Sequence, residues 1–172
     1  APVAGLKNLT YFELEANSVT DMSPLAKLTQ LTRISLKSAK MGPDLKWMTG
    51  LTALREIEIN AGSALTSFEG FPALKGDPRV ALNGASPADL SPLKSLGSSK
   101  LELRYCTIQD LSPLASMPNL RELSLYGATV KDFSPLAKCA KLKQLSYYAV
   151  KDADFSTLAA LKQVTELDGG LT

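Results

Sequence analysis

A short phrase recurs along this chain at a nearly constant spacing, and it limits the folds that the chain can adopt. The phrase joins an aspartate to Ser-Pro-Leu, as in residues 21–25 and 132–136. The leucine after the proline, or the apolar residue in its place, falls at Leu25, Met48, Phe71, Leu93, Leu114, Leu136 and Leu158. These positions lie 21 to 23 residues apart. A fixed period of this size is typical of a solenoid of stacked coils, which offers an extended surface rather than a closed pocket.

Two further apolar patterns complete each repeat. One is a column of mostly leucines at Leu28, Leu51, Leu74, Leu96, Met117, Cys139 and Leu161. The other is an alternating pair, such as Ile57 with Ile59 or Leu123 with Leu125. Alternation with period two predicts a short strand with one buried face. We therefore expect about seven repeats in a single domain over residues 1–172, with eight parallel strands, the last near Leu167.

The Ser-Pro-Leu phrase predicts where a helical segment begins. Serine is a common helix N-cap residue, and proline fits the first turn, where no N–H is needed. A short helical or 3₁₀ segment should begin at each phrase, on the side opposite the sheet. The preceding aspartates, such as Asp21 and Asp110, place a negative charge near the start of the helical segment, where the helix dipole is positive and the interaction is favourable. A calcium site is less favoured, because each aspartate is repeated singly without clustered oxygen ligands.

With these residues in view, the repeats resemble the 22-residue leucine-rich repeats of bacterial internalin-like proteins. The residues that carry the likeness are Leu-Arg-Glu-Leu-Ser-Leu at 120–125 and Asp-Phe-Ser-Pro-Leu-Ala at 132–137. The resemblance implies an α/β solenoid, a right-handed coil with a concave parallel β-sheet and short helical or 3₁₀ segments on the convex side. It also implies a secreted or cell-surface bacterial protein that binds a protein partner, although a cytoplasmic location stays open.

The chain departs from this family pattern in two places. The family has an asparagine after the strand, but here only Asn17 fits. The later copies have Ala39, Gly62, Ala85, Cys106, Ala128 and Val150. We expect looser or wetter turns there, because the asparagine hydrogen bonds must be replaced. In another leucine column, polar residues stand in place of leucine at Asp77 and Ser99. They predict a rearranged and more exposed chain just before two of the strands. This irregularity is either sequence drift that the repeats tolerate, or a bend or contact site.

The composition argues against several classes of function. Histidine is absent, so the commonest general base and metal ligand is missing. The two cysteines, Cys106 and Cys139, are too few for a disulfide framework and are interpreted as free core thiols. A net charge of +2 does not suggest nucleic acid, and no apolar stretch is long enough to insert into a membrane. We expect no catalytic residue, cofactor or metal.

The strand residues that point away from the core form three columns across the sheet. The first, which includes Arg33, Glu56 and Arg79, alternates partly in charge and is interpreted as a solvated ladder. The third column supplies the predicted partner-binding residues, together with the neighbouring Tyr105. These predicted residues are Lys37, Asn60, Asn83, Arg104, Tyr105, Tyr126 and Tyr148. Tyrosine and arginine are enriched where interfaces bind most strongly. The alternative is that the tyrosines stack on one another and merely cover the sheet.

These observations favour a non-catalytic protein-binding module that uses its concave face to hold another protein. An intracellular adaptor or immunity-type inhibitor and a structural spacer are the alternatives. The first residues of the chain align with residues inside a repeat, and no polar cap is visible at either end. We therefore expect the chain to be part of a longer protein.

Overall fold

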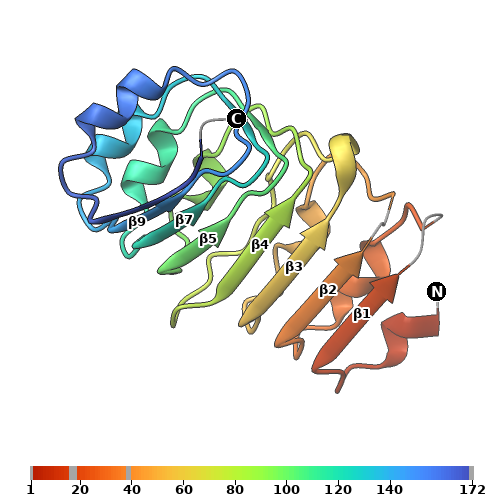
Figure 1. The fold of residues 1–172 in the computed structure, drawn as a ribbon. Coiled ribbons are helices and arrows are strands. Elements are labelled where there is room, and N and C mark those ends of the chain that lie inside the picture. Colours follow the sequence, from red (N-terminus) through yellow and green to blue (C-terminus); the bar gives the residue numbers. More distant parts are fainter. Residues whose placement is uncertain (1, 16–18, 38–39, 171–172) are drawn as a thin grey trace.

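The computed structural model describes residues 2–15, 19–37 and 40–170, and its centre is one parallel sheet. Eight strands follow one another in chain order across this sheet (Figure 1). They are β1 (Tyr11–Glu15), β2 (Arg33–Lys37), β3 (Glu56–Asn60), β4 (Arg79–Asn83), β5 (Lys100–Glu102), β7 (Glu122–Ser124), β9 (Gln144–Ser146) and β10 (Glu166–Asp168). Each pair of neighbours is parallel and separated by one coil. The predicted eight-stranded solenoid is confirmed.

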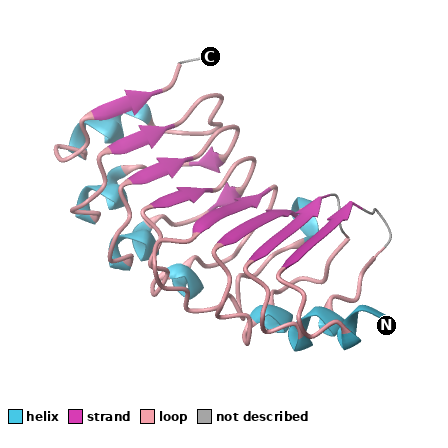
Figure 2. Cartoon of the chain, turned by 90° about the horizontal axis from the view of Figure 1, so that it is seen from below, coloured by secondary structure: helices cyan, strands magenta, loops and turns pink. Residues whose placement is uncertain are grey.

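Most coils carry a short 3₁₀ helix on the side opposite the sheet, but the predicted segment at Phe71 is not helical. The 3₁₀ helices are η1 (Pro2–Gly5), η2 (Ser23–Lys27), η3 (Lys46–Met48), η4 (Gly62–Ala64), η5 (Ser91–Leu93), η6 (Ser112–Ser116), η7 (Ser134–Lys138) and η8 (Phe155–Ala160). Figure 2 shows the strands along the inner side of a curved array, with most of these helices along its outer side. No α-helix occurs within the described ranges. A second sheet of two strands, β6 (Thr107–Ile108) and β8 (Thr129–Val130), was not predicted.

The core lies between the sheet and the 3₁₀ helices, where apolar residues at equivalent repeat positions stack from coil to coil. The leucine after the proline is buried in most coils, as at Leu93, Leu114 and Leu136, and the inward strand residues are buried from Ile34 to Leu145. The terminal coils pack less completely, and Leu167 on β10 is exposed. A solenoid coil buries its apolar side chains only against its neighbours, so the end coils bury less than the middle ones.

The structure corrects the predicted role of serine at the start of each 3₁₀ helix. No serine side chain caps these helices; the serine is the first helical residue. Instead, the aspartate two residues earlier accepts a hydrogen bond from the serine backbone N–H, at 2.9 Å for Asp21 and 2.8 Å for Asp110. The serine hydroxyl and, after it, the serine backbone N–H lower the pKa of both carboxyl groups. Each of these aspartate side chains thus closes a turn on the backbone two residues later.

The turns after the strands are tighter than expected from the missing asparagines. Ala85, Cys106 and Ala128 are buried, and backbone bonds join one coil to the next at this position. The N–H of Thr107 donates to the carbonyl of Ala85 at 3.0 Å, and the N–H of Thr129 donates to that of Cys106 at 2.8 Å. The prediction of looser turns is therefore wrong here, because small buried residues let the backbones meet directly. Asn17 and Ala39 lie outside the described residues.

Both cysteines are buried and free, as predicted. Burial raises the pKa of each thiol to about 11, because the thiolate would lose its hydration. The Cys106 thiol donates to the carbonyl oxygen of Leu82 at 3.2 Å. Neither thiol is therefore activated as a nucleophile.

Around Asp77 and Ser99 the coil is preserved, because the residue that occupies the buried position is shifted along the sequence. Asp77 is exposed, as expected, with a left-handed φ of 61°. Its carboxylate accepts hydrogen bonds from the Ser99 N–H at 2.6 Å and from the Ser99 hydroxyl at 2.9 Å. Ser98, not Ser99, takes the buried position, and its hydroxyl donates to the Pro78 carbonyl at 2.7 Å. The polar groups are thus paired, and a role in partner contact stays a prediction.

Candidate functional site

The concave face presents the outward strand residues in the three predicted columns. The strand register aligns Tyr11 with Arg33, then Glu56 and Arg79, in the first column. The middle column aligns Ser35 with Glu58 and then Ala81. Beyond the short strands, backbone bonds keep the third column in line. The Tyr105 N–H donates to the Tyr126 carbonyl, and the Gly127 N–H donates to the Tyr148 carbonyl, each at 2.8 Å.

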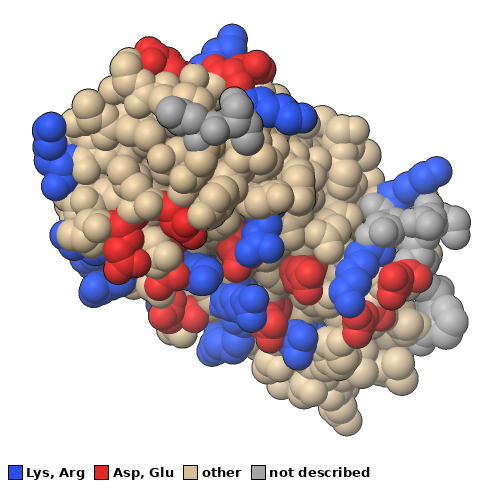
Figure 3. Space-filling view, in the orientation of Figure 1, with Lys and Arg blue, Asp and Glu red and all other residues tan. Residues whose placement is uncertain are grey.

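Over β1 to β5 many of the charged side chains pair with a neighbour. Arg33 lies 3.3 Å from Glu56, and Lys100 lies 3.3 Å from Glu122, each pair joining neighbouring strands. Figure 3 shows basic and acidic side chains interleaved over this part of the face. Exposed pairs of this kind add little stability. The first column therefore contains two ion pairs between neighbouring strands, and Arg79, which lies between them, is in no ion pair within the described residues.

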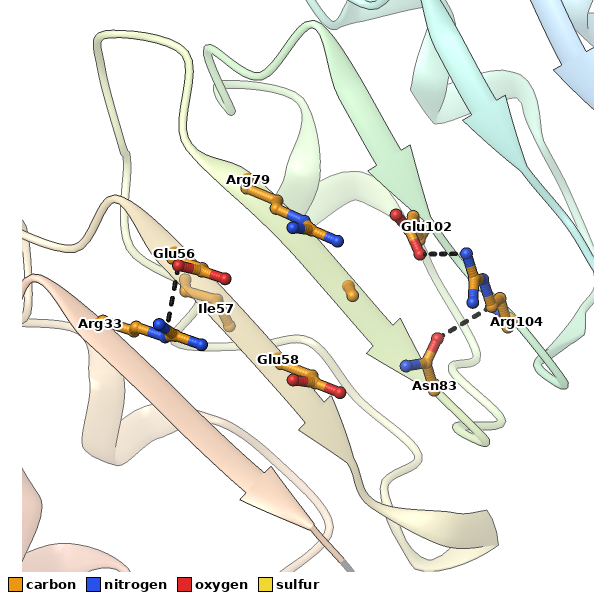
Figure 4. A pocket seen from close by; sticks show the side chains of 9 residues that line it. Arg33, Glu56, Ile57, Glu58, Arg79, Asn83, Glu102 and Arg104 are labelled. Atoms are coloured by element: carbon orange, nitrogen blue, oxygen red, sulfur yellow. Dashed lines mark hydrogen bonds and ion pairs between the residues drawn. The ribbon is translucent and has the colours of Figure 1, made fainter. Parts of the chain in front are cut away.

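A shallow hollow of about 250 Å³ lies over β3 and β4 and is itself balanced in charge. Its charged lining consists of Arg33, Arg79, Arg104, Glu56, Glu58 and Glu102. In Figure 4, Arg79 points from β4 toward Glu102 on the next strand. The buried Glu102 accepts a charge-assisted bond from the Arg104 guanidinium at 2.7 Å. Three guanidinium groups and three carboxylates leave this hollow without a dominant charge.

Three of the predicted partner-binding residues bond to their neighbours. The Lys37 ammonium lies 2.7 Å from Glu13, which raises the pKa of Lys37 and lowers that of Glu13. The Asn83 amide donates to the Asn60 side-chain oxygen at 2.9 Å. The Asn83 oxygen in turn accepts from the Arg104 backbone N–H at 3.3 Å. These residues lie on the concave face as predicted, with some or all of their polar groups already paired.

The tyrosines form a different surface at the other end. Tyr105 is 61% exposed, Tyr126 41% and Tyr148 42%. Tyr105 and Tyr126 meet edge to face, with ring centroids 5.4 Å apart. A second hollow, of about 330 Å³, is lined by Arg104, Tyr105, Tyr126 and two small floor residues, Ser124 and Ser146.

The predicted patch is therefore only partly one site. The structure brings Arg104, Tyr105 and Tyr126 together around the second hollow and places Tyr148 on the next coil, beside it. Asn60 and Asn83 line a neighbouring hollow that Tyr105 also lines, and Lys37 lines neither of the two. The alternative of stacked tyrosines is also present, since two of the rings touch. Whether these residues bind a partner stays a prediction.

Backbone conformation explains why Tyr105 stands out from the surface. Its φ is 57°, in the left-handed region that non-glycine residues rarely adopt. Gly84, Gly127 and Ala149 occupy the same position in their repeats, also with positive φ. The Tyr105 ring lies against Gly127, where an added Cβ would come within 2.5 Å of it. Two glycines at one repeat position were the sequence signal for this turn.

Sequence reasoning missed Asp168 as part of the site. It is exposed at the end of the middle column, and its carboxylate accepts a hydrogen bond from the Tyr148 hydroxyl at 2.6 Å. This bond raises the pKa of Tyr148. The hydroxyl bond restrains the Tyr148 ring. The signal was present in the sequence, because Asp168 follows two serines in its column and is the first charged residue there after Glu102.

Comparison with known proteins identifies the fold. No family model matches the sequence, and no curated protein matches it. Among solved structures, internalin C2 of Listeria monocytogenes is similar over 98% of this chain and 74% of its own, with 24% identity and a TM-score of 0.72. The fold is a leucine-rich repeat solenoid.

Two further leucine-rich repeat structures show how widely this fold is shared. Internalin F of Listeria monocytogenes is 22% identical over 98% of this chain and 56% of its own, with a TM-score of 0.61. The plant peptide hormone receptor RGFR1, solved with RGF2, is 13% identical over 98% of this chain and 29% of its own, with a TM-score of 0.60. The described part of this solenoid has no helix long and apolar enough to span a membrane.

Proposed function

We propose that this chain is a non-catalytic module that binds another protein on the concave face of its sheet. The observation that carries the proposal is the row of exposed tyrosines on three consecutive coils, beside a hollow with a small polar floor. Tyrosine offers a large rigid surface and loses little conformational entropy on binding. A surface of this kind is suited to contact with a partner protein.

The tyrosines are held in place before any partner arrives. Tyr105 lies against Gly127 and Tyr126, and the Tyr148 hydroxyl is bonded to Asp168. Side chains that are already ordered reduce the entropy lost on association, which favours binding. The rigid parallel sheet beneath them fixes their spacing along the solenoid.

The chemistry of the face supports binding rather than catalysis. The chain has no histidine, and the carboxylates of the central hollow face three guanidinium groups that balance their charge. A general acid or base needs a group that can exchange a proton near neutral pH. The fold is also shared with the plant peptide hormone receptor RGFR1, whose structure was solved in complex with RGF2.

The proposal is tested on the tyrosines themselves. A photo-crosslinking residue at position 126 identifies proteins that touch the concave face, and one at Lys138 on the convex side serves as the reference. The double variant Tyr126→Ala with Tyr148→Ala should then bind the identified partner more weakly by over about 1 kcal/mol, measured by calorimetric titration. Its melting temperature should stay close to that of the parent, because both side chains are exposed.

A matched control removes two exposed convex side chains. Lys27→Ala with Lys138→Ala lies on η2 and η7 and should leave affinity unchanged. Equal affinity of the tyrosine variant and the parent protein would contradict the proposal. So would a loss of affinity in the convex control alone.

A further inference from the structure

The two ends of the concave face differ in charge. Over β1 to β5, including Arg104, five cations face five carboxylates. They are Arg33, Lys37, Arg79, Lys100 and Arg104 with Glu13, Glu15, Glu56, Glu58 and Glu102. Over β7 to β10 the outward residues include Glu122, Glu166 and Asp168 but no lysine or arginine. Because the whole chain carries +2, this acidic end is a local feature.

The carboxylates at this end have few partners. Glu122 pairs with Lys100 on β5. Within the described residues, neither Glu166 nor Asp168 lies within ion-pair distance of a lysine or arginine. Both are exposed, and Asp168 is bonded to the hydroxyl of Tyr148. An aromatic ring and a carboxylate thus stand together without a cation.

At the opposite end of the same face, a bonded tyrosine–carboxylate pair does have a cation beside it. There the Tyr11 hydroxyl donates to Glu13, much as Tyr148 donates to Asp168. The Arg33 guanidinium then lies over the Tyr11 ring, 5.1 Å from its centroid. A cation over a tyrosine face is stabilised by the ring quadrupole. The first strands therefore supply their own cation to a bonded tyrosine–carboxylate pair, and the last strands do not.

We propose that Tyr126, Tyr148 and Asp168 bind an arginine or lysine side chain that projects from a basic segment of the partner protein. The inference rests on the proposed function and adds the chemistry of the partner. The cation lies against the tyrosine rings and pairs with Asp168, with Glu166 as a second carboxylate on the same strand. The hollow over Ser124 and Ser146 leaves room for the neighbouring residues of that segment. An acidic segment is disfavoured, because no outward cation lies on these strands and Arg104 is paired with Glu102.

The test uses two blocked peptides that differ only in charge. One is acetyl-Gly-Arg-Gly-amide, and the other has citrulline, a neutral near-isostere, in place of arginine. Each is titrated into the isotopically labelled 172-residue protein and followed by the backbone amide signals in NMR. The arginine peptide should bind in about the millimolar range, since a single exposed side chain contributes little free energy. It should shift the amide signals of residues 124–127, 146–148 and 168, and the citrulline peptide should bind at least about threefold more weakly.

Two variants locate the contact. Asp168→Asn keeps an oxygen that can accept from the Tyr148 hydroxyl but removes the charge, and should weaken the arginine peptide about threefold to tenfold. Glu58→Gln neutralises a carboxylate in the same column over β3 and should leave affinity unchanged. Added salt should weaken the parent protein and reduce its difference from Asp168→Asn, because exposed charges are screened.

Three outcomes would overturn the inference: equal binding of the citrulline peptide, no effect of Asp168→Asn, or no binding of the arginine peptide. The failure of the wider proposal is distinguishable from these. A crosslinked partner that loses affinity for the double tyrosine variant but not for Asp168→Asn leaves concave-face binding intact and removes only the cationic contact. A partner indifferent to both variants removes both.

Discussion

The first four strands and the last four are built on the same repeat but present different surfaces. Strands β1 to β4 have five residues each, whereas β5, β7, β9 and β10 have three. The outward side chains of the first group mostly pair with one another. Those of the second include exposed tyrosines and two carboxylates, Glu166 and Asp168, that form no ion pair within the described residues. The inward columns make the coil, so the outward positions can diverge without cost to the core.

In the later coils, the residue that follows the third column has a left-handed backbone conformation. Tyr105, Gly127 and Ala149 have positive φ, and each turns the chain away from the sheet. The equivalent residue after β3, Ala61, has φ of −89°. After Tyr105 and Gly127, the chain enters β6 and β8, the small second sheet. The left-handed turn is not by itself what shortens the strands, because Gly84 has a φ of 76° after the five-residue strand β4.

The largest expected effect tests whether both halves share one core. Leu123→Ala on β7 and Ile57→Ala on β3 each remove a buried side chain, at 2% and 1% exposure. Each should lower the free energy of unfolding by about 2 to 5 kcal/mol, through lost burial and the cavity left behind. Urea denaturation measures both. A near-neutral result for only one of them would mean that the halves are not equally packed.

A smaller effect is expected at the left-handed turn that supports Tyr105. Gly127→Ala would place a Cβ within 2.5 Å of the Tyr105 ring at a φ of 66°. The strain should cost about 1 to 3 kcal/mol of stability, and the Tyr105 ring should move. Thermal unfolding and the NMR ring signals of Tyr105 check the two parts.

Gly50→Ala is the matched control for that turn. Gly50 has no positive φ, and nothing lies within 4 Å of an added Cβ. It should therefore be close to neutral. If Gly127→Ala is as stable as the Gly50 variant and leaves Tyr105 in place, the rigid support of the tyrosine surface is refuted.

The smallest effect concerns pH and should be the same in both halves. Hydrogen bonds from Ser23 and Ser112 lower the pKa values of Asp21 and Asp110 in the folded protein. A lowered folded pKa stabilises the protein above the ordinary aspartate pKa, and this contribution is lost as pH falls from about 4 through the folded pKa. Asp21→Asn and Asp110→Asn should each make stability slightly less sensitive to acid. Urea midpoints from neutral to acidic pH measure this, and a steeper acid dependence in either variant would contradict it.

Much of the architecture could be predicted because each coil repeats the same local sequence pattern. The spacing of Leu25 and its equivalents predicted the coils, and the alternation at Ile57 and Ile59 predicted the strands. The serine cap was wrong, because an aspartate two residues earlier forms the turn and leaves the serine hydroxyl without that role. The loose turns were wrong, because Ala85 and Ala128 are small enough for direct backbone bonds between coils.

The sequence by itself determined the solenoid, its parallel sheet, the buried columns and the outward columns that include Arg104, Tyr126 and Tyr148. These follow from local periodicity, which needs no knowledge of distant contacts. Only the tertiary structure decided which outward groups neutralise one another, that Tyr105 projects from a left-handed turn, and that Asp168 bonds to Tyr148. Those outcomes depend on the lateral register of neighbouring coils and on the rotation of each side chain, and a repeat pattern specifies neither.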